Sequence, residues 1–283
     1  MGRHVEVPLR WGDLDAQGHV NNARFIDYLQ EARADFLLGS PVSHLLGGGM
    51  VVVSHQIEYL APIESRDEPV LVDVAVLSCG GAQIELGYRL HHQGRCCARA
   101  RTRLCPYDLT EQRVRRLSGA ERAWFRDQVE PAEPLRDLIR LPITERAFAA
   151  PIRVRWSDID SYGHVNNVCF FEYIQQARVV FASRADGEMR RAAATAGEYL
   201  WLVLRQDVEY RRPLTFRTEP YLVRVGLASA GRTSLVFCSD LVDPVTGDQH
   251  ATAATVVVCG DRHGTPVPLP DHWKLALQPY TLS

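Results

Sequence analysis

The chain has 283 residues, of which 46% are hydrophobic and 23% charged, as in folded globular proteins and unlike disordered or collagenous ones. Its 32 basic and 34 acidic residues give a net charge of -2, which excludes an overall electrostatic attraction to nucleic acid or to an anionic membrane. No apolar run approaches the length of a membrane span. At about 100–200 residues per domain, the length predicts two domains.

The cysteine content and the first residues indicate the compartment. Seven cysteines are present, without a C-x-x-C pair and without the density of a disulfide-stapled secreted protein. The opening residues, MGRHVEVPLRW, hold no apolar signal core. We therefore expect a cytoplasmic protein.

The first predicted element is a strand. Residues 3–11 alternate between apolar and polar side chains, which is typical of a half-buried strand. This alternation places Trp11 in the core, together with Trp156, the tryptophan of a similar later segment.

A long helix is predicted next. From residue 22 onward, apolar residues recur every three to four positions, and Gly39 stands where a glycine after a helix is favoured. Asn21 or Asn22 can serve as the N-cap. The apolar stripe consists of Phe25, Leu29, Ala32 and Phe36.

Four strands complete the pattern. Segments rich in β-branched residues cover approximately 50–60, 69–79, 82–93 and 95–106. Short links between the last strands favour antiparallel neighbours, so one sheet covers one long helix. The predicted fold class is α+β.

This pattern occurs twice in the chain. Residues 10–33 align without gaps with residues 155–178, and 14 of the 24 positions are identical. The similarity continues where IEYLAP at 57–62 matches VEYRRP at 208–213. A segment with three prolines separates the copies and reads as a linker. The predicted organisation is a first unit at 1–128, a linker at 129–148 and a second unit at 149–283.

The doubled segment, RWGDLDAQGHVNN and RWSDIDSYGHVNN, resembles hotdog-fold thioesterases of the 4-hydroxybenzoyl-CoA thioesterase type and the related acyl-ACP thioesterases. Their motif is an Asp shortly before a helix that opens with His-Val-Asn-Asn. The resemblance implies two hotdog units, each a long helix on an antiparallel sheet, packed as an intramolecular pseudo-dimer. It implies a hydrolase of acyl-CoA or acyl-ACP that needs no cofactor besides the CoA of its substrate. Homo-oligomers of the double-hotdog chain are a further expected assembly.

The resemblance also assigns candidate site residues. Asp15 and Asp160 stand at the catalytic Asp of the family, and His19 and His164 follow four residues later. Either histidine can orient the aspartate or hydrogen-bond the substrate.

The position between Asp and His departs from the family pattern. The acyl-ACP branch has an Asn there, whereas this chain has Gln17 in the first copy and Tyr162 in the second. The departure leaves open whether the Tyr162 site is active.

Thioester hydrolysis requires attack on the carbonyl carbon and stabilisation of the oxyanion that forms. The unsatisfied amides at the helix starts, near Asn22 and Asn167, are natural oxyanion donors. The aspartate can activate water or attack directly, and the sequence leaves both routes open. The leaving thiolate needs no metal, and the sequence shows no convincing metal-ligand spacing.

Alternative interpretations accompany these assignments. Asp15 and Asp160 can instead be turn or cap residues. The chain can be a non-hydrolytic acyl-CoA-binding or regulatory hotdog protein, whereas HVNN speaks against a hotdog dehydratase. The arginines at 99, 101 and 103 alternate on a strand, so they either bind CoA phosphates or form a solvated face.

Overall fold

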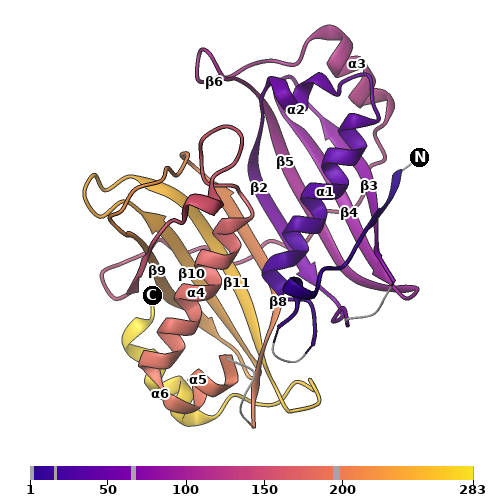
Figure 1. The fold of residues 1–283 in the computed structure, drawn as a ribbon. Helices are drawn as coiled ribbons and strands as arrows, with labels where there is room; N and C mark the ends of the chain where they lie inside the picture. The colour runs from indigo at the N-terminus through magenta and orange to yellow at the C-terminus, as the bar shows by residue number, and fades with distance from the viewer. Residues whose placement is uncertain (1–2, 16–17, 65–67, 194–197, 283) are drawn as a thin grey trace. The chain divides into compact units, whose positions relative to one another are not determined.

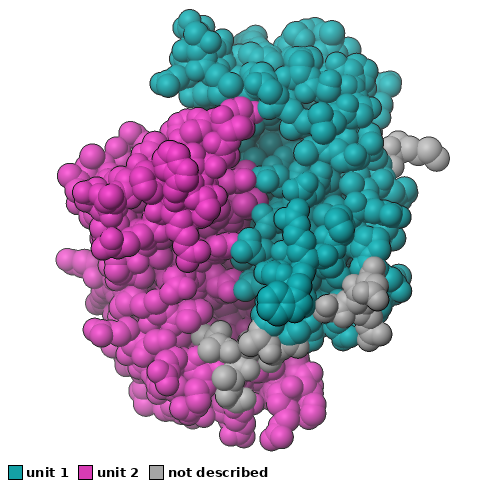
Figure 2. All heavy atoms as spheres, in the orientation of Figure 1, with its two compact units in different colours: residues 1–136 teal, residues 137–283 magenta. Residues whose placement is uncertain are grey.

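The computed structural model describes residues 3–15, 18–64, 68–193 and 198–282. The chain divides into two compact units, residues 1–136 and 137–283, which Figure 2 shows in different colours. Among the described residues, no helix is both long and apolar enough to cross a membrane.

Unit 1 is an antiparallel sheet with one long helix, α1, across one face (Figure 1). Its strands lie in the order β1-β3-β4-β5-β2, and β6 pairs with β5. The helices are α1 (Phe25–Leu38), α2 (His44–Gly48) and α3 (Gly119–Asp127), with 3-10 turns at Trp11–Asp13 and Asn22–Arg24. The strands are β1 (Arg3–Val7), β2 (Met50–Tyr59), β3 (Val70–Cys79), β4 (Ile84–His92), β5 (Arg95–Asp108) and β6 (Arg113–Val114).

Unit 2 repeats this architecture, with α4 across its sheet (Figure 1). Its strands lie in the antiparallel order β7-β9-β10-β11-β8. The helices are α4 (Cys169–Ala185), α5 (Gly187–Ala193) and α6 (Asp271–Leu277), with 3-10 turns at Trp156–Asp158 and Gln278–Tyr280. The strands are β7 (Phe148–Ile152), β8 (Leu200–Tyr210), β9 (Tyr221–Ala230), β10 (Ser234–Val242) and β11 (Gln249–Gly260). The predicted α+β class is confirmed for both units.

The core of unit 1 lies between α1 and the sheet. Phe25, Leu29, Ala32 and Phe36, the predicted apolar stripe, are buried, and α1 contacts β1 and β3. Burial of a side chain the size of leucine or phenylalanine contributes about 1.5–3 kcal/mol. The helix ends at Leu38 with Gly39 at its C-cap, as predicted.

The first strand is shorter than its alternation suggested. It ends at Val7, because Pro8 has no N–H to donate to the ladder and residues 11–13 form a 3-10 turn. Trp11 and Trp156 are consequently 90% and 75% exposed, so the prediction that both lie in the core is wrong. The other four predicted strands of unit 1, β2 to β5, begin and end within two residues of their predicted bounds, and β6 was not predicted.

Residues 130–144, between the folded parts of the two units, form neither helix nor strand. On the unit 1 side, Arg101 Nη2 donates to the carbonyl of Ala132 at 2.9 Å and also to that of Glu133. On the unit 2 side, Arg140 pairs with Asp207 at 3.3 Å. An arginine therefore fastens each end of this segment to the unit to which it belongs.

The first turn of helix α3 contains a buried glutamate, Glu121, that accepts several hydrogen bonds. Ser118 and Glu121 form a capping box, with the Glu121 N–H to Ser118 Oγ at 3.2 Å and the Ser118 N–H to Glu121 Oε2 at 2.7 Å. Arg115 donates to both carboxylate oxygens at 2.9 Å. These hydrogen bonds, led by those of Arg115, hold the pKa of Glu121 at about 2, below its usual value.

Glu121 should make the stability of unit 1 pH-dependent. Because its pKa is lowered by folding, its ionised form stabilises the fold fully above about pH 4.5, and this stabilisation disappears as the pH falls toward 2. We expect Glu121→Gln to lower the free energy of unfolding by about 1–3 kcal/mol at pH 7 and by less at pH 3. Urea unfolding at both pH values measures this. The exposed Glu111→Gln is the control, and equal losses for Glu121→Gln at both pH values would contradict the prediction.

Candidate active site

The first copy of the motif folds into a tight loop just before α1. The N–H of Asp15 donates to the carbonyl of His19 at 2.7 Å, and the N–H of His19 donates to Asp15 Oδ1 at 3.2 Å. Gly18 has a φ of 78°, a left-handed conformation that favours glycine, and its N–H reaches the Asp15 carbonyl at 3.1 Å. The loop thus brings Asp15 and His19 opposite one another. Gln17 lies outside the described residues.

The second copy has the same geometry. Asp160 and His164 repeat the backbone bond at 2.8 Å and the bond to Asp160 Oδ1 at 3.4 Å. Gly163 has a φ of 77°. The Tyr162 N–H adds a bond to Asp160 Oδ1 at 2.8 Å. Oδ1 therefore caps the loop, as the structural interpretation predicts, while Oδ2 of Asp160 accepts no hydrogen bond from the described part of the chain.

A second aspartate in each motif anchors the loop to the helix. Asp13 Oδ2 accepts the Tyr28 hydroxyl at 2.9 Å and the Arg10 N–H at 3.0 Å. Asp158 Oδ2 accepts the Tyr173 hydroxyl at 2.5 Å. Burial, followed by the neighbouring carboxylate, raises the pKa of both tyrosines. These aspartates are committed to structure, which explains why both copies contain D-x-D.

The helix starts are capped by the first Asn of each HVNN. Asn21 Oδ1 accepts the N–H of Ala23 at 3.0 Å, and Asn166 Oδ1 accepts the N–H of Val168 at 3.3 Å. These bonds decide between the two N-cap candidates that the sequence left open in each copy.

A tyrosine from the neighbouring sheet fixes each helix start. The Tyr59 hydroxyl on β2 donates to the carbonyl of Asn22 at 2.8 Å, and the Tyr210 hydroxyl on β8 donates to that of Asn167 at 2.8 Å. Both tyrosines belong to the repeated I/V-E-Y element. The carbonyls point to the sheet, so the amides of the first turn keep their direction.

The side chain of the second Asn distinguishes the two copies. Asn22 Nδ2 is buried and has no hydrogen-bond partner among the described residues. Asn167 Nδ2 instead donates to Asn166 Oδ1 at 3.1 Å. The first copy thus holds an unsatisfied amide donor at its helix start, and the second uses the same group internally.

The two histidines are partly buried, and within the described ranges their imidazoles make no hydrogen bond. His19 and His164 are therefore available to a ligand. Tyr162 is partly buried.

The sequence analysis missed one acidic residue near the site. Asp27 lies in the first turn of α1 and pairs with Arg24 at 3.1 Å. Burial raises the pKa of its carboxyl above the usual value, against the opposing effect of Arg24. The second copy has Glu172 at this position, and this repeated acid eight residues after the histidine was the available signal.

One group of side chains in the described part of the chain has the composition of a metal site. The ligand atoms of Asp186, Glu188 and His272 lie within 4.8 Å of one another. Glu188 Oε2 already accepts hydrogen bonds from His272 Nε2 at 2.8 Å and from Trp273 Nε1 at 3.1 Å. These bonds connect α6 to α5 and explain why the three side chains are close together.

The fold and the doubled motif define a tandem hotdog protein, and comparison with known proteins gives its family. The family model of the thioesterase-like superfamily matches residues 9–132 and again residues 154–277. The chain therefore belongs to the thioesterase-like superfamily, and it is a thioester hydrolase. No curated protein matches the sequence.

Solved structures match the fold over nearly the whole chain. A protein assigned as an oleoyl thioesterase from Lactobacillus plantarum has a TM-score of 0.70 at 15% identity, covering 95% of this chain and 96% of its own. An acyl-ACP thioesterase from Bacteroides thetaiotaomicron gives 0.67 at 12% identity, covering 91% and 97%. The 12:0-ACP thioesterase from Umbellularia californica gives 0.67 at 14% identity, covering 92% and 97%. At these identities the match shows a shared fold.

The tyrosines that fix the helix starts give a stability prediction. We expect Tyr59→Phe and Tyr210→Phe each to lower the free energy of unfolding by about 0.5–1.5 kcal/mol, because the backbone carbonyl loses the tyrosine hydroxyl donor while the ring stays in place. Chemical denaturation measures the change. Tyr107→Phe is the matched control on β5. A change for Tyr59→Phe no larger than that of the control would contradict this role.

Proposed function

We propose that this enzyme hydrolyses the thioester of an acyl-CoA or acyl-ACP at the loops before α1 and α4. The observation that carries the proposal is the loop geometry, in which the carboxylate accepts the backbone N–H of the histidine just before the helix in both units. The structural neighbours from Bacteroides thetaiotaomicron and Umbellularia californica are acyl-ACP thioesterases by title, which supports an acyl carrier as the substrate class. All seven cysteines are free thiols, which fits the cytoplasmic location that we also propose.

In the proposed mechanism, Asp15 or Asp160 removes a proton from water, which attacks the thioester carbonyl carbon. The free Oδ2 of Asp160 is the atom available for this step, since Oδ1 is committed to the loop. Direct attack by the same carboxylate, giving an anhydride that water then opens, uses the same position. Collapse of the tetrahedral intermediate breaks the C–S bond and expels the thiolate, which takes up the proton.

The negative charge on the carbonyl oxygen requires donors. The N–H of Asn22 has no partner among the described residues, and it stands at the positive end of the helix dipole. An oxyanion donor of this kind contributes about 10²–10³ in rate. The helix start at Asn167 supplies the equivalent position in unit 2, and His19 or His164 orients the carboxylate or the substrate.

The substrate class is tested with a panel of acyl-CoAs and acyl-ACPs. We expect release of free thiol, detected with a thiol-reactive dye, from at least one carrier with short, long or aromatic acyl groups. Mass spectrometry of the same samples should show one molecule of free acid for each molecule of thiol released. Absence of turnover across both carriers and all three acyl classes would refute the proposal.

The roles of the aspartates are tested by isosteric substitution. We expect Asp15→Asn and Asp160→Asn each to remove the activity of one site, and the double variant to lower kcat by at least about 10²-fold, because the amide cannot accept the proton. Asp15→Asn should cause the larger loss of kcat. Asn22 Nδ2 in unit 1 has no hydrogen-bond partner among the described residues, whereas Asn167 Nδ2 in unit 2 already donates to Asn166 Oδ1.

The control for these variants is Asp127→Asn, an exposed aspartate at the end of α3. It should leave kcat within twofold of the unmodified enzyme. Circular dichroism checks that each variant is folded. If the folded double variant keeps the unmodified rate, the assigned base is wrong even though the chain is a thioester hydrolase.

A further inference from the structure

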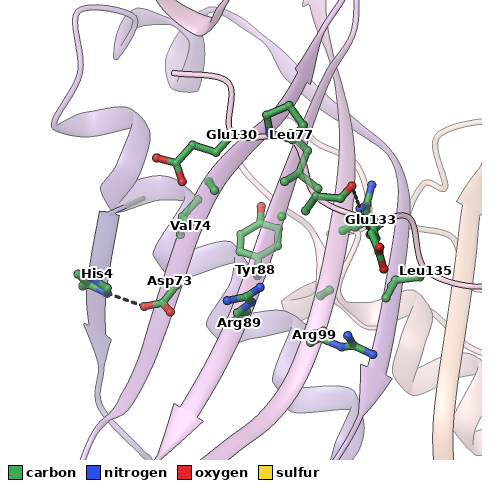
Figure 3. A pocket seen from close by; sticks show the side chains of 16 residues that line it. His4, Asp73, Val74, Leu77, Tyr88, Arg89, Arg99, Glu130, Glu133 and Leu135 are labelled. Carbon is green, nitrogen blue, oxygen red and sulfur yellow. Dashed lines mark hydrogen bonds and ion pairs between the residues drawn. The ribbon is translucent and has the colours of Figure 1, made fainter. Parts of the chain in front are cut away.

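The face of the unit 1 sheet opposite α1 carries a pocket of about 690 Å³. We call this face the outer face. Strands β3, β4 and β5 form the floor of the pocket, and residues 130–135 form its roof (Figure 3). All of its lining residues belong to unit 1, and the motif loop and Asn22 are not among them. The pocket is therefore distinct from the candidate active site.

One edge of the pocket is a row of charged side chains that crosses five strands. Direct cross-strand partners place Glu58, Arg99, Arg89, Asp73 and His4 side by side in that order. Glu58 pairs with Arg99 at 2.5 Å, and Asp73 pairs with His4 at 2.5 Å. A second histidine, on β4, approaches Asp73 at 3.4 Å. Glu58 and Arg99 therefore pair at one end of the row, and His4 and Asp73 pair at the other.

Arg89, in the middle of the row, makes no ion pair or side-chain hydrogen bond with the described residues of the chain. It stands directly opposite Arg99, and like charges in that position repel each other. Figure 3 shows both arginines at the same edge of the pocket. An anion placed between them removes this repulsion and forms charge-assisted hydrogen bonds.

The floor beside the arginines is apolar. Ala75 and Gly87 offer little or no side chain there, and Leu77 lies over Gly87, so that a Cβ added to Gly87 would meet Leu77 Cδ1 at 2.8 Å. The apolar part of a ligand on this floor would therefore contact Ala75 and Leu77.

The roof is firmly attached. The N–H of Glu130 donates to the Val76 carbonyl at 2.8 Å, and the buried Arg101 holds the carbonyls of Ala132 and Glu133. The roof is therefore attached to the sheet at residue 130 and again at residues 132 and 133.

The corresponding surface of unit 2, on β9 and β10, has a different charge arrangement. Its charged pair has the opposite arrangement, with Arg224 on β9 and Asp240 on β10, joined by two hydrogen bonds of 2.8 and 2.5 Å. Cys238 stands two residues before Asp240, as Gly87 stands two residues before Arg89. Its sulfur accepts the N–H of Leu141 at 3.3 Å. Unit 2 therefore pairs its arginine internally, whereas unit 1 leaves Arg89 without an ion pair among the described residues.

From this contrast we infer that the outer face of unit 1 is a second binding site, for a small organic anion. Its carboxylate or phosphate group pairs with Arg89 beside Arg99, and its short apolar part lies over Gly87 and Leu77. This site does not depend on the proposed hydrolysis, because it uses none of the same residues.

The test is a titration followed by amide NMR of the full chain labelled with ¹⁵N-glycine. The probes are sodium octanoate, octyl phosphate and octan-1-ol, which share the apolar chain and differ in the head group. We expect a saturable shift of the Gly87 amide with at least one anion and none with octan-1-ol at the same concentrations. A response to octanoate identifies a carboxylate ligand, and a response to octyl phosphate identifies a phosphate ligand.

Arg89→Gln should weaken this binding at least about tenfold, the loss typical of one charge-assisted contact. The matched control is Arg113→Gln, which removes an arginine that is 73% exposed elsewhere in unit 1 and should leave the titration unchanged. The inference is overturned if neither anion shifts Gly87, if octan-1-ol binds equally well, or if Arg89→Gln binds as tightly as the unmodified protein.

Discussion

The attachment of each helix start to its sheet is the constraint on which the candidate site depends. A tyrosine hydroxyl from β2 or β8 reaches the carbonyl of the second Asn of the motif, just before the helix, at 2.8 Å in both units. The aromatic ring below it packs edge-on against Phe25 or Phe170, with centroids 5.2 and 5.0 Å apart. This contact fixes the amides of the first turn, and the motif loop is then built on a rigid base.

The loop itself shows how one residue type serves two purposes. Asp13 and Asp158 each use Oδ2 for the fold, where it accepts from a helix tyrosine and from the backbone of the preceding turn. Asp160, two residues later, commits only one oxygen to the loop. In Asp160, Oδ1 serves the fold, and the proposed chemistry is assigned to Oδ2. The structural and catalytic interpretations of the D-x-D motif therefore apply to different atoms and do not exclude each other.

The two units are alike in the hydrogen bonds that hold the motif loop and the helix, and they differ on their outer faces. The loop bonds and glycine conformations agree closely between the copies. The outer faces differ, because Arg224 and Asp240 pair in unit 2 while Arg89 stays unpaired in unit 1 among the described residues. The arginines at 99 and 101 are not a uniform basic surface, since each has an acidic partner.

The sequence alone determined the repeat, the α+β class, the helix stripe and the bounds of most strands, because periodicity and local turn chemistry are written in neighbouring residues. It also singled out Asp15, His19 and their counterparts, which lie within one loop. It could not place Trp11, which a 3-10 turn carries to the surface, or choose between Asn21 and Asn22 as the cap. Only the structure decided those points, together with the state of Arg89. The turn and the cap are local conformations that the residue types permit without dictating, whereas the surroundings of Arg89 come from strands that are distant in sequence and adjacent in space.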